Sequence, residues 1–192
     1  MAATTNMSER ILDAAQHLVQ TRGYNAFSYN DIAAVVGIRK ASIHYHFPGK
    51  GDLGRRVVGR FRETCRATLA EIDRATADPR ARLERYTTLF RATLDNDRMC
   101  LCGMLASEFA SLPEGVRDEL VAAFADHEAW LTVVLQAGQQ AGHFRVDVPA
   151  EEQARNLMAG LEGATLLARL HDDTGRFQAA ARALLAALVA VP

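Results

Sequence analysis

Residues 28–50 read SYNDIAAVVGIRKASIHYHFPGK, and this stretch contains the signals for two short helices joined by one tight turn. Ser28 is suited to cap the first helix, and Asp31 follows it at capping-box spacing, in place of the more usual Glu. Gly37 ends this helix, because glycine readily adopts the left-handed conformation that closes a helix. A second helix is predicted over about 39–47, since a Pro-Gly pair terminates it. The spacing is that of a helix-turn-helix motif.

The second of these helices is predicted to contact DNA. In a helix-turn-helix motif it enters the major groove with its N-terminus foremost, where side-chain donors meet phosphates and base edges. The residues predicted to contact DNA are Arg39, Lys40, Ser42, His44, Tyr45, His46 and Lys50. Lys50 is expected to hold a phosphate at the start of the next helix. His44 and His46, two residues apart on a helix, face different directions, so no metal site is predicted.

Elsewhere apolar residues recur at spacings of three and four, and no run alternates polar and apolar residues as a strand would. The pattern predicts an all-α protein of about nine helices. Ser8 is suited to cap the first helix, which ends near Gly23. A long helix is expected from about Lys50 to Arg74. A further helix begins at Asp78, because a capping residue there precedes a proline.

The net charge of −1 conceals two segments of opposite sign. Residues 1–62 contain nine Lys and Arg against four Asp and Glu, a net charge of +5, whereas the remaining residues contain 13 against 19, a net charge of −6. The two lysines of the chain, Lys40 and Lys50, both lie in the basic segment. This asymmetry favours a polyanionic partner for the first segment.

The stretch from Ser8 to about Phe61 resembles the N-terminal pattern of the TetR/AcrR family of bacterial transcription regulators. The matching residues are Ile11-Leu12-Asp13-Ala14-Ala15, Gly23-Tyr24, Asp31-Ile32-Ala33, Gly37-Ile38 through Phe47, Lys50 and Leu53. Two positions depart from the commonest pattern: Arg39 stands where Ser or Thr is frequent, and His44 where Tyr is frequent. These departures affect which DNA base edges the second helix is predicted to contact.

The resemblance implies a domain organisation and an assembly. After a disordered tail over 1–7, a three-helix DNA-binding domain is expected over 8–62, and a larger effector-binding and dimerisation domain over 63–192. The resemblance also implies a homodimer joined by the last two helices. The residues expected at this interface are Leu157, Gly160, Leu161, Ala164, Leu184 and Leu188. Glycine on a packed helix face permits close approach.

An effector pocket between the C-terminal helices would be lined by apolar side chains and a few polar groups. The candidates are Phe90, Leu94, Met104, Glu108, Phe109, Trp130, Met158 and Glu162. Glu108 and Glu162 attract attention because each lies within an apolar stripe, where an unpaired carboxylate is costly. Plain core packing is the alternative for the apolar candidates, and an exposed helix face is the alternative for Glu108.

The sequence thus predicts a ligand-responsive DNA-binding regulator. The simplest form is a repressor that binds a palindromic operator as a homodimer and is released by a small-molecule inducer. One alternative is a response to thiol oxidation or electrophiles through Cys100 and Cys102, because a thiolate near a helix start is more reactive; structural packing competes with that interpretation. Another is a DNA-binding module with no ligand response.

Catalysis has little support in the sequence. No nucleophile elbow, P-loop or paired metal-ligand motif occurs, so no cofactor and no enzymatic activity are expected, and a helical enzyme is a minor alternative. His127 beside Glu128 is expected to be an ordinary exposed pair. Three cysteines offer no disulfide framework, the apolar runs are too short to span a bilayer, and residues 1–8 are not a secretory signal. A cytoplasmic protein with reduced thiols and no membrane partner is predicted.

Overall fold

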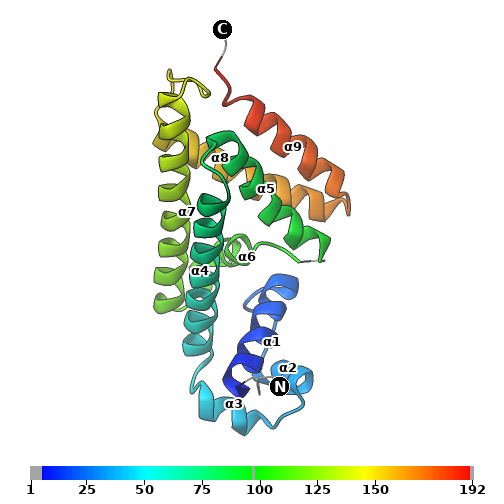
Figure 1. Cartoon of the computed structure of the whole chain (residues 1–192). Helices are drawn as coiled ribbons and strands as arrows, with labels where there is room; N and C mark the ends of the chain where they lie inside the picture. The colour runs from blue at the N-terminus through cyan, green and yellow to red at the C-terminus, as the bar shows by residue number, and fades with distance from the viewer. Residues whose placement is uncertain (1–5, 97, 191–192) are drawn as a thin grey trace. The chain divides into compact units, whose positions relative to one another are not determined.

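The computed structural model describes residues 6–96 and 98–190, which form nine α-helices, one 3₁₀ helix and no strand (Figure 1). The prediction of an all-α protein with about nine helices is therefore confirmed for these residues. The helices are α1 (Met7–Arg22), α2 (Tyr29–Val36), α3 (Lys40–His46), α4 (Lys50–Ala75), α5 (Pro79–Asp95), α6 (Leu101–Ser107), the 3₁₀ helix η1 (Phe109–Ser111), α7 (Glu114–Gln140), α8 (Ala150–Leu170) and α9 (Thr174–Ala186). Residues 1–5 of the predicted tail lie outside the described residues.

Local capping sets most of the helix boundaries. Ser28 and Asp31 form the predicted capping box, and Gly37 ends α2 with φ of 75°. Asp78 caps α5, whose first residue is a proline. The start of α1 differs from the prediction, because Asn6 is the capping residue and accepts a hydrogen bond of 3.2 Å from the amide of Ser8. An Asn side chain satisfies a free amide of the first turn as well as Ser does.

The chain forms two compact units. The first contains residues up to Glu63 together with 101–123, and the second contains 64–100 and 124 onward. The first unit therefore includes α6, η1 and the beginning of α7 in addition to the helices expected over 8–62. Both α4 and α7 contribute residues to each unit.

In the first unit the apolar stripe of α1 packs on the short helices and on the segment 101–123. Ile11, Ile32 and Ile43 are fully buried, as is Val116 of α7. A glycine allows this packing: a Cβ at Gly54 of α4 would lie 2.8 Å from the ring of Tyr24 and 3.0 Å from Cγ2 of Val116. Residues of α7 thus belong to the same core as the helix-turn-helix.

Glu108 connects the segment 101–123 to the end of α1 through hydrogen bonds. Its carboxylate accepts hydrogen bonds from the backbone amides of Tyr24 at 2.6 Å and Asn25 at 3.3 Å, which follow the last turn of α1. The side-chain amide of Asn25 also donates to the hydroxyl of Ser111 at 2.7 Å. Gly23, with φ of 93°, leaves room, because a Cβ there would lie 3.0 Å from the Glu108 carboxylate. Two amides that would otherwise lack partners are thereby satisfied.

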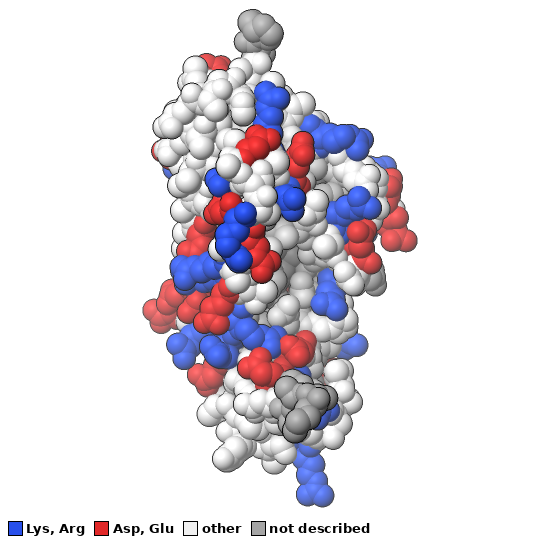
Figure 2. Space-filling view, viewed as in Figure 1, with Lys and Arg blue, Asp and Glu red and all other residues white. Residues whose placement is uncertain are grey.

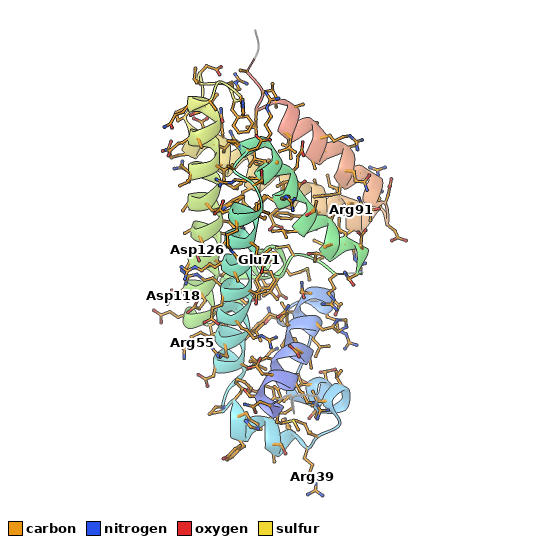
Figure 3. The ribbon with its side chains drawn as sticks, in the orientation of Figure 1. Arg39, Arg55, Glu71, Arg91, Asp118 and Asp126 are labelled. Atoms are coloured by element: carbon orange, nitrogen blue, oxygen red, sulfur yellow. The ribbon has the colours of Figure 1, made fainter. Side chains whose placement is uncertain are left out.

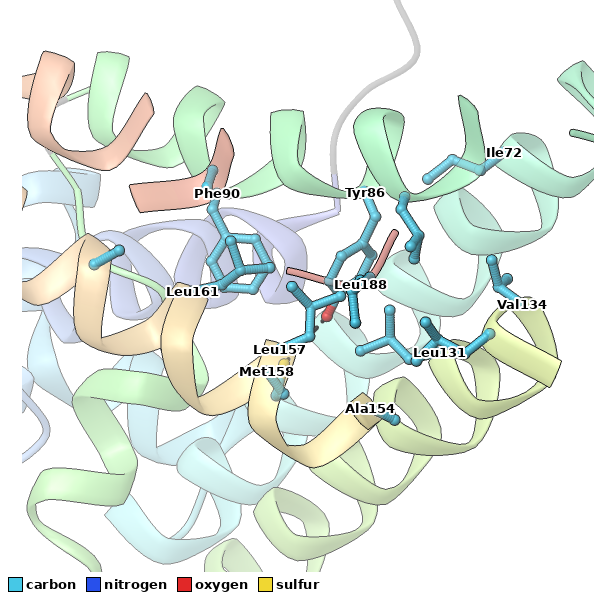
Figure 4. Close-up of a cluster of buried hydrophobic side chains, with 14 of the residues drawn as sticks. Ile72, Tyr86, Phe90, Leu131, Val134, Ala154, Leu157, Met158, Leu161 and Leu188 are labelled. Atoms are coloured by element: carbon cyan, nitrogen blue, oxygen red, sulfur yellow. Dashed lines mark hydrogen bonds between the residues drawn. The ribbon is translucent and has the colours of Figure 1, made fainter. Parts of the chain in front are cut away.

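The second unit has its own core, formed by α5, α8, α9 and parts of α4 and α7 (Figure 4). Tyr86 of α5 is completely buried, and its ring stacks on that of Trp130 with centroids 5.4 Å apart. Figure 4 shows Leu157, Met158 and Leu161 of α8 in this same cluster. Among the described residues, no helix is long and apolar enough to cross a bilayer.

Four of the six residues expected at the dimer interface are buried within one chain, and the interface itself stays a prediction. Leu157, Leu161, Ala164 and Leu188 are all buried within the single chain, so their side chains are not available to a partner. Gly160 packs on its own chain as well, since a Cβ there would lie 2.7 Å from Cδ2 of Leu184. The helix α9 ends at Ala186, so Leu188 lies beyond it. The stripe seen in the sequence is the face that joins α8 and α9 within one subunit.

Removal of the Glu108 carboxylate should destabilise the first unit. We expect Glu108→Ala to lower the free energy of unfolding by about 1–3 kcal/mol, because the amides of Tyr24 and Asn25 lose their acceptor. Urea unfolding measures this loss, and hydrogen exchange at the Tyr24 amide should accelerate. The control is Asp118→Ala, an exposed acid of the same unit, which should change stability by less than about 0.5 kcal/mol. Equal effects of the two substitutions would contradict the role of Glu108.

Candidate nucleic-acid interface

The turn between α2 and α3 holds α3 on the first unit by its apolar side. Ile43 of α3 is fully buried, and Phe47, which follows the helix, is 7% exposed. The hydroxyl of Tyr29 donates a hydrogen bond of 2.9 Å to the carbonyl of Phe47, so the end of α3 is also fixed by a buried polar contact. The remaining sides of this seven-residue helix face away from the core.

The residues predicted to contact DNA lie mostly on this outward side. Arg39, Lys40, Ser42, His44 and Tyr45 are exposed, whereas His46 and Lys50 are half-buried. Arg39 is the N-cap of α3, makes no capping hydrogen bond, and points away from the helices (Figure 3). Tyr45 is 86% exposed, which is unusual for a large ring on a short, well-anchored helix. The outward side of α3 thus presents two cations and a hydroxyl near its start and a ring near its end to solvent.

His44 has contacts within the unit as well as an exposed edge. Its Nδ1 lies 3.2 Å from the carbonyl of Pro48, and its ring lies against Tyr29 with centroids 4.7 Å apart. These contacts hold the ring in one orientation. The ring of Tyr45 instead meets that of His46 in an edge-to-face arrangement, with centroids 5.2 Å apart.

Lys50, which is expected to hold a phosphate, has contacts within its own unit. Its ammonium donates a hydrogen bond of 2.5 Å to the carbonyl of Phe27 and lies 4.3 Å from the centroid of the Phe27 ring and 4.6 Å from that of Tyr24. Burial lowers the pKa of Lys50, and the nearby carboxylate of Glu108 opposes this shift. The structure therefore gives the side chain of Lys50 a role in holding the α1–α2 connection.

Most of the other positive charges counted in the first 62 residues are also used internally. Arg60 pairs with Glu9 at 2.9 Å and with Asp13 at 2.8 Å. Arg62 pairs with Glu119, and Arg10 donates to the backbone carbonyl of Val36. Arg39 and Lys40, by contrast, make no ion pair with any residue that the structure describes. The positive charges of this segment that make no ion pair or hydrogen bond with a described residue are thus those of Arg39 and Lys40 at the start of α3 and of the exposed Arg55 and Arg56 of α4.

The expected effector-pocket residues are divided between the two units. Met104, Glu108 and Phe109 belong to the first unit, where Phe109 is 42% exposed and Glu108 binds the amides after α1. Phe90, Leu94, Trp130, Met158 and Glu162 belong to the second unit. Phe90, Leu94 and Met158 lie in one core, against which Trp130 packs, whereas the carboxylate of Glu108 already has backbone partners.

A polar group that sequence reasoning placed on the surface lies inside this second core. His127 is only 9% exposed, so the expectation of an exposed pair with Glu128 is wrong. The hydroxyl of Tyr86 lies 3.0 Å from Nδ1 of His127 and 3.2 Å from Sδ of Met158. Burial lowers the pKa of His127, which favours the neutral ring. The partner residue is 41 positions away, so no local pattern could reveal it.

Glu162 and Cys100 form a second polar contact in this unit. The thiol of Cys100 is hydrogen-bonded to the carboxylate of Glu162, whose pKa is raised by burial and lowered less strongly by this bond. Oε1 of Glu162 is buried and has no hydrogen-bond partner among the described residues. Cys102 is buried, and Cys100, which precedes α6, is half-buried. Thiol sensing stays a prediction, with Cys100 the more accessible of the two.

Comparison with known proteins identifies the same two parts of the chain. Residues 11–57 match the family described as "Bacterial regulatory proteins, tetR family", and residues 79–184 match "Tetracyclin repressor-like, C-terminal domain". The HTH-type transcriptional regulator LmrA of Bacillus subtilis is 32% identical over 167 residues, which cover 83% of this chain and 84% of LmrA. The HTH-type transcriptional repressor DhaR of a Mycobacterium species is 28% identical over 165 residues, which cover 85% of this chain and 83% of DhaR.

A solved structure agrees with these matches. The crystal structure of a TetR-family transcriptional regulator from Agrobacterium tumefaciens is 39% identical, covers 95% of this chain and 97% of its own, and superposes with a TM-score of 0.92. The matched families and relatives are transcription regulators and not enzymes. The exposed α3 helix, the two matched domains and these relatives together show that the chain belongs to the TetR family of DNA-binding transcriptional regulators.

Proposed function

We propose that this protein is a repressor that binds a palindromic operator as a homodimer and releases it when a small molecule binds the second unit. The observation that carries the proposal is the outward side of α3, where Arg39 and Lys40 at its start and Tyr45 near its end are exposed on a helix anchored by Ile43. This geometry suits a recognition helix in the major groove. Repression is supported by the description of DhaR as a repressor.

A dimer is supported by an apolar face that one chain leaves uncovered. On α8, Leu166, Leu167 and Leu170 are 59%, 54% and 73% exposed, and they share a face with Gly163. On α9, the exposed Ala179 and Ala183 continue a stripe of small residues. Three exposed leucines on one face indicate an interface rather than scattered surface residues. We propose this face in place of the residues expected from the sequence.

The effector is proposed to bind in the core of the second unit. The support is the buried Oε1 of Glu162, since a buried carboxylate oxygen without a hydrogen-bond donor is rare and a ligand donor would satisfy it. Helix α4 supplies coupling, because a single helix contributes residues to both units. A ligand would favour one arrangement of the dimer, and operator affinity falls when the two recognition helices no longer fit successive grooves.

The proposals that the operator is palindromic and that a small molecule releases it can be tested directly. DNA selected from a random pool by the purified protein should contain an inverted repeat with half-site centres about one helical turn, ~34 Å, apart. A library of small molecules screened against the selected duplex should then contain compounds that release it. A single asymmetric site would contradict the dimeric arrangement, and failure of every compound to change affinity would contradict ligand control.

The two lysines should behave differently when the salt dependence of DNA binding is measured. Lys40→Ala should reduce the slope of log affinity against log salt by about one unit and leave thermal stability unchanged, because an exposed phosphate contact is lost. Lys50→Met should leave the slope unchanged and lower the melting temperature, because its ammonium binds the carbonyl of Phe27. A reduced slope for Lys50→Met with an unchanged slope for Lys40→Ala would instead indicate that Lys50 contacts a phosphate.

The proposed interface predicts the oligomeric state of two variants. Leu167→Glu should sediment as a monomer and lose high-affinity operator binding, because it places a carboxylate in an apolar contact. Val146→Glu changes a valine outside α8 that is 75% exposed, and this variant should remain a dimer. A dimeric Leu167→Glu protein would exclude this face.

A further inference from the structure

A groove on the surface of the second unit lies between α5 and α9. Its main hollow has a volume of about 570 Å³, within the range of small-molecule sites. Ala181 and Leu185 of α9 form an apolar floor beside Phe177, and Thr87 and Thr88 of α5 form the opposite wall. These α9 residues are distinct from Ala179 and Ala183 of the proposed dimer face. The groove is also lined by none of the residues proposed for the effector.

A second hollow of about 190 Å³ adjoins the first and shares Glu84 and Leu185 with it. Its walls are mainly apolar, with Leu83, Phe144 and Val189 among the lining residues. The two hollows therefore form one elongated groove. The main hollow is lined by Arg91, Arg182 and Glu84, whereas the second hollow is lined by Arg80 and Glu84 beside its apolar residues.

The charges around the groove are unequal along its length. Arg182 is exposed and has no ion pair or hydrogen bond with a described residue. Arg91 forms an ion pair with Asp95, with 3.4 Å between its Nε and Oδ2 of the carboxylate. Glu84 is the acidic side chain lining the groove and lies where the two hollows meet. Basic and acidic side chains are both visible over α5 and α9 in Figure 2, and Arg91 is labelled in Figure 3.

We propose that this groove binds an amphipathic carboxylate with a medium-length acyl chain. The carboxylate would pair with Arg182 and Arg91, because guanidinium groups bind carboxylates through paired hydrogen bonds. The chain would lie over Ala181 and Leu185 and end in the apolar second hollow. Two arginines line the main hollow and one, Arg80, lines the second, so the main hollow is the more positive end for the carboxylate.

The chemistry of the groove discriminates among ligands of similar size. A cationic amine with the same chain would be repelled by Arg182 and Arg91 and attracted only by Glu84, which lies where the two hollows meet. A neutral alcohol would fill the second hollow but leave both guanidinium groups to solvent. The site therefore selects the negative head group, and its apolar part selects the chain.

Calorimetric titration of the full-length protein with decanoate, below its micelle concentration, tests the site. We expect saturable binding at one site per chain, at least tenfold tighter than that of decylamine or decanol. Arg182→Glu should weaken decanoate binding at least tenfold, and Arg182→Lys should retain most of it. The control is Arg176→Glu, which changes an exposed arginine of α9 that does not line the groove and pairs with Asp173.

Gln178→Trp provides an independent variant, because Gln178 lines the groove and a larger side chain there would fill it. It should abolish decanoate binding while operator binding stays unchanged. Absence of decanoate binding to the wild-type protein would overturn the proposal. So would binding that survives both Arg182→Glu and Gln178→Trp, since the ligand would then lie elsewhere, including the effector core. Operator affinity is measured separately, so failure of this site leaves the proposed repressor function untouched.

Discussion

The DNA-facing surface depends on the burial of Ile43 beneath α3. A helix of seven residues is too short to be stable by itself in water, so its direction is set by what it packs against. Ile43 and Phe47 attach it to the first unit, and the hydroxyl of Tyr29 holds the carbonyl at its end. Because that side of the helix is fixed against the core, the side chains of Arg39 and Tyr45 are exposed to solvent. The apolar contact thus decides where the polar chemistry is presented.

Electrostatics in the first unit divides its basic residues into two kinds. Arg60 and Lys50 bind carboxylates, carbonyls or rings of the same unit and stabilise its packing. Arg39 and Lys40 make no ion pair with a described residue, so their charges are available to a polyanion. A net charge counted over a segment does not separate these kinds, because it takes no account of which charges are already neutralised.

Several side chains have partners far away along the chain, which no local sequence pattern indicates. Glu108 binds amides 83 and 84 positions away, and His127 meets Tyr86 across 41 positions. The stripe containing Leu157 and Leu161 is apolar, but the same stripe suits an internal core and a dimer interface equally well. Only the packing of α8 on α9 showed that these leucines are enclosed and that Leu167 is exposed.

The sequence alone determined the helices, the capping box of Ser28, the turn at Gly37 and the family resemblance of the N-terminal segment, because these depend on interactions within a few residues. Only the tertiary structure decided which charges are free, which apolar face is left uncovered and where Glu108 and Lys50 bind. Those properties depend on which surfaces meet when helices distant in sequence pack together, and hydrophobic periodicity specifies that a face is buried without specifying its partner.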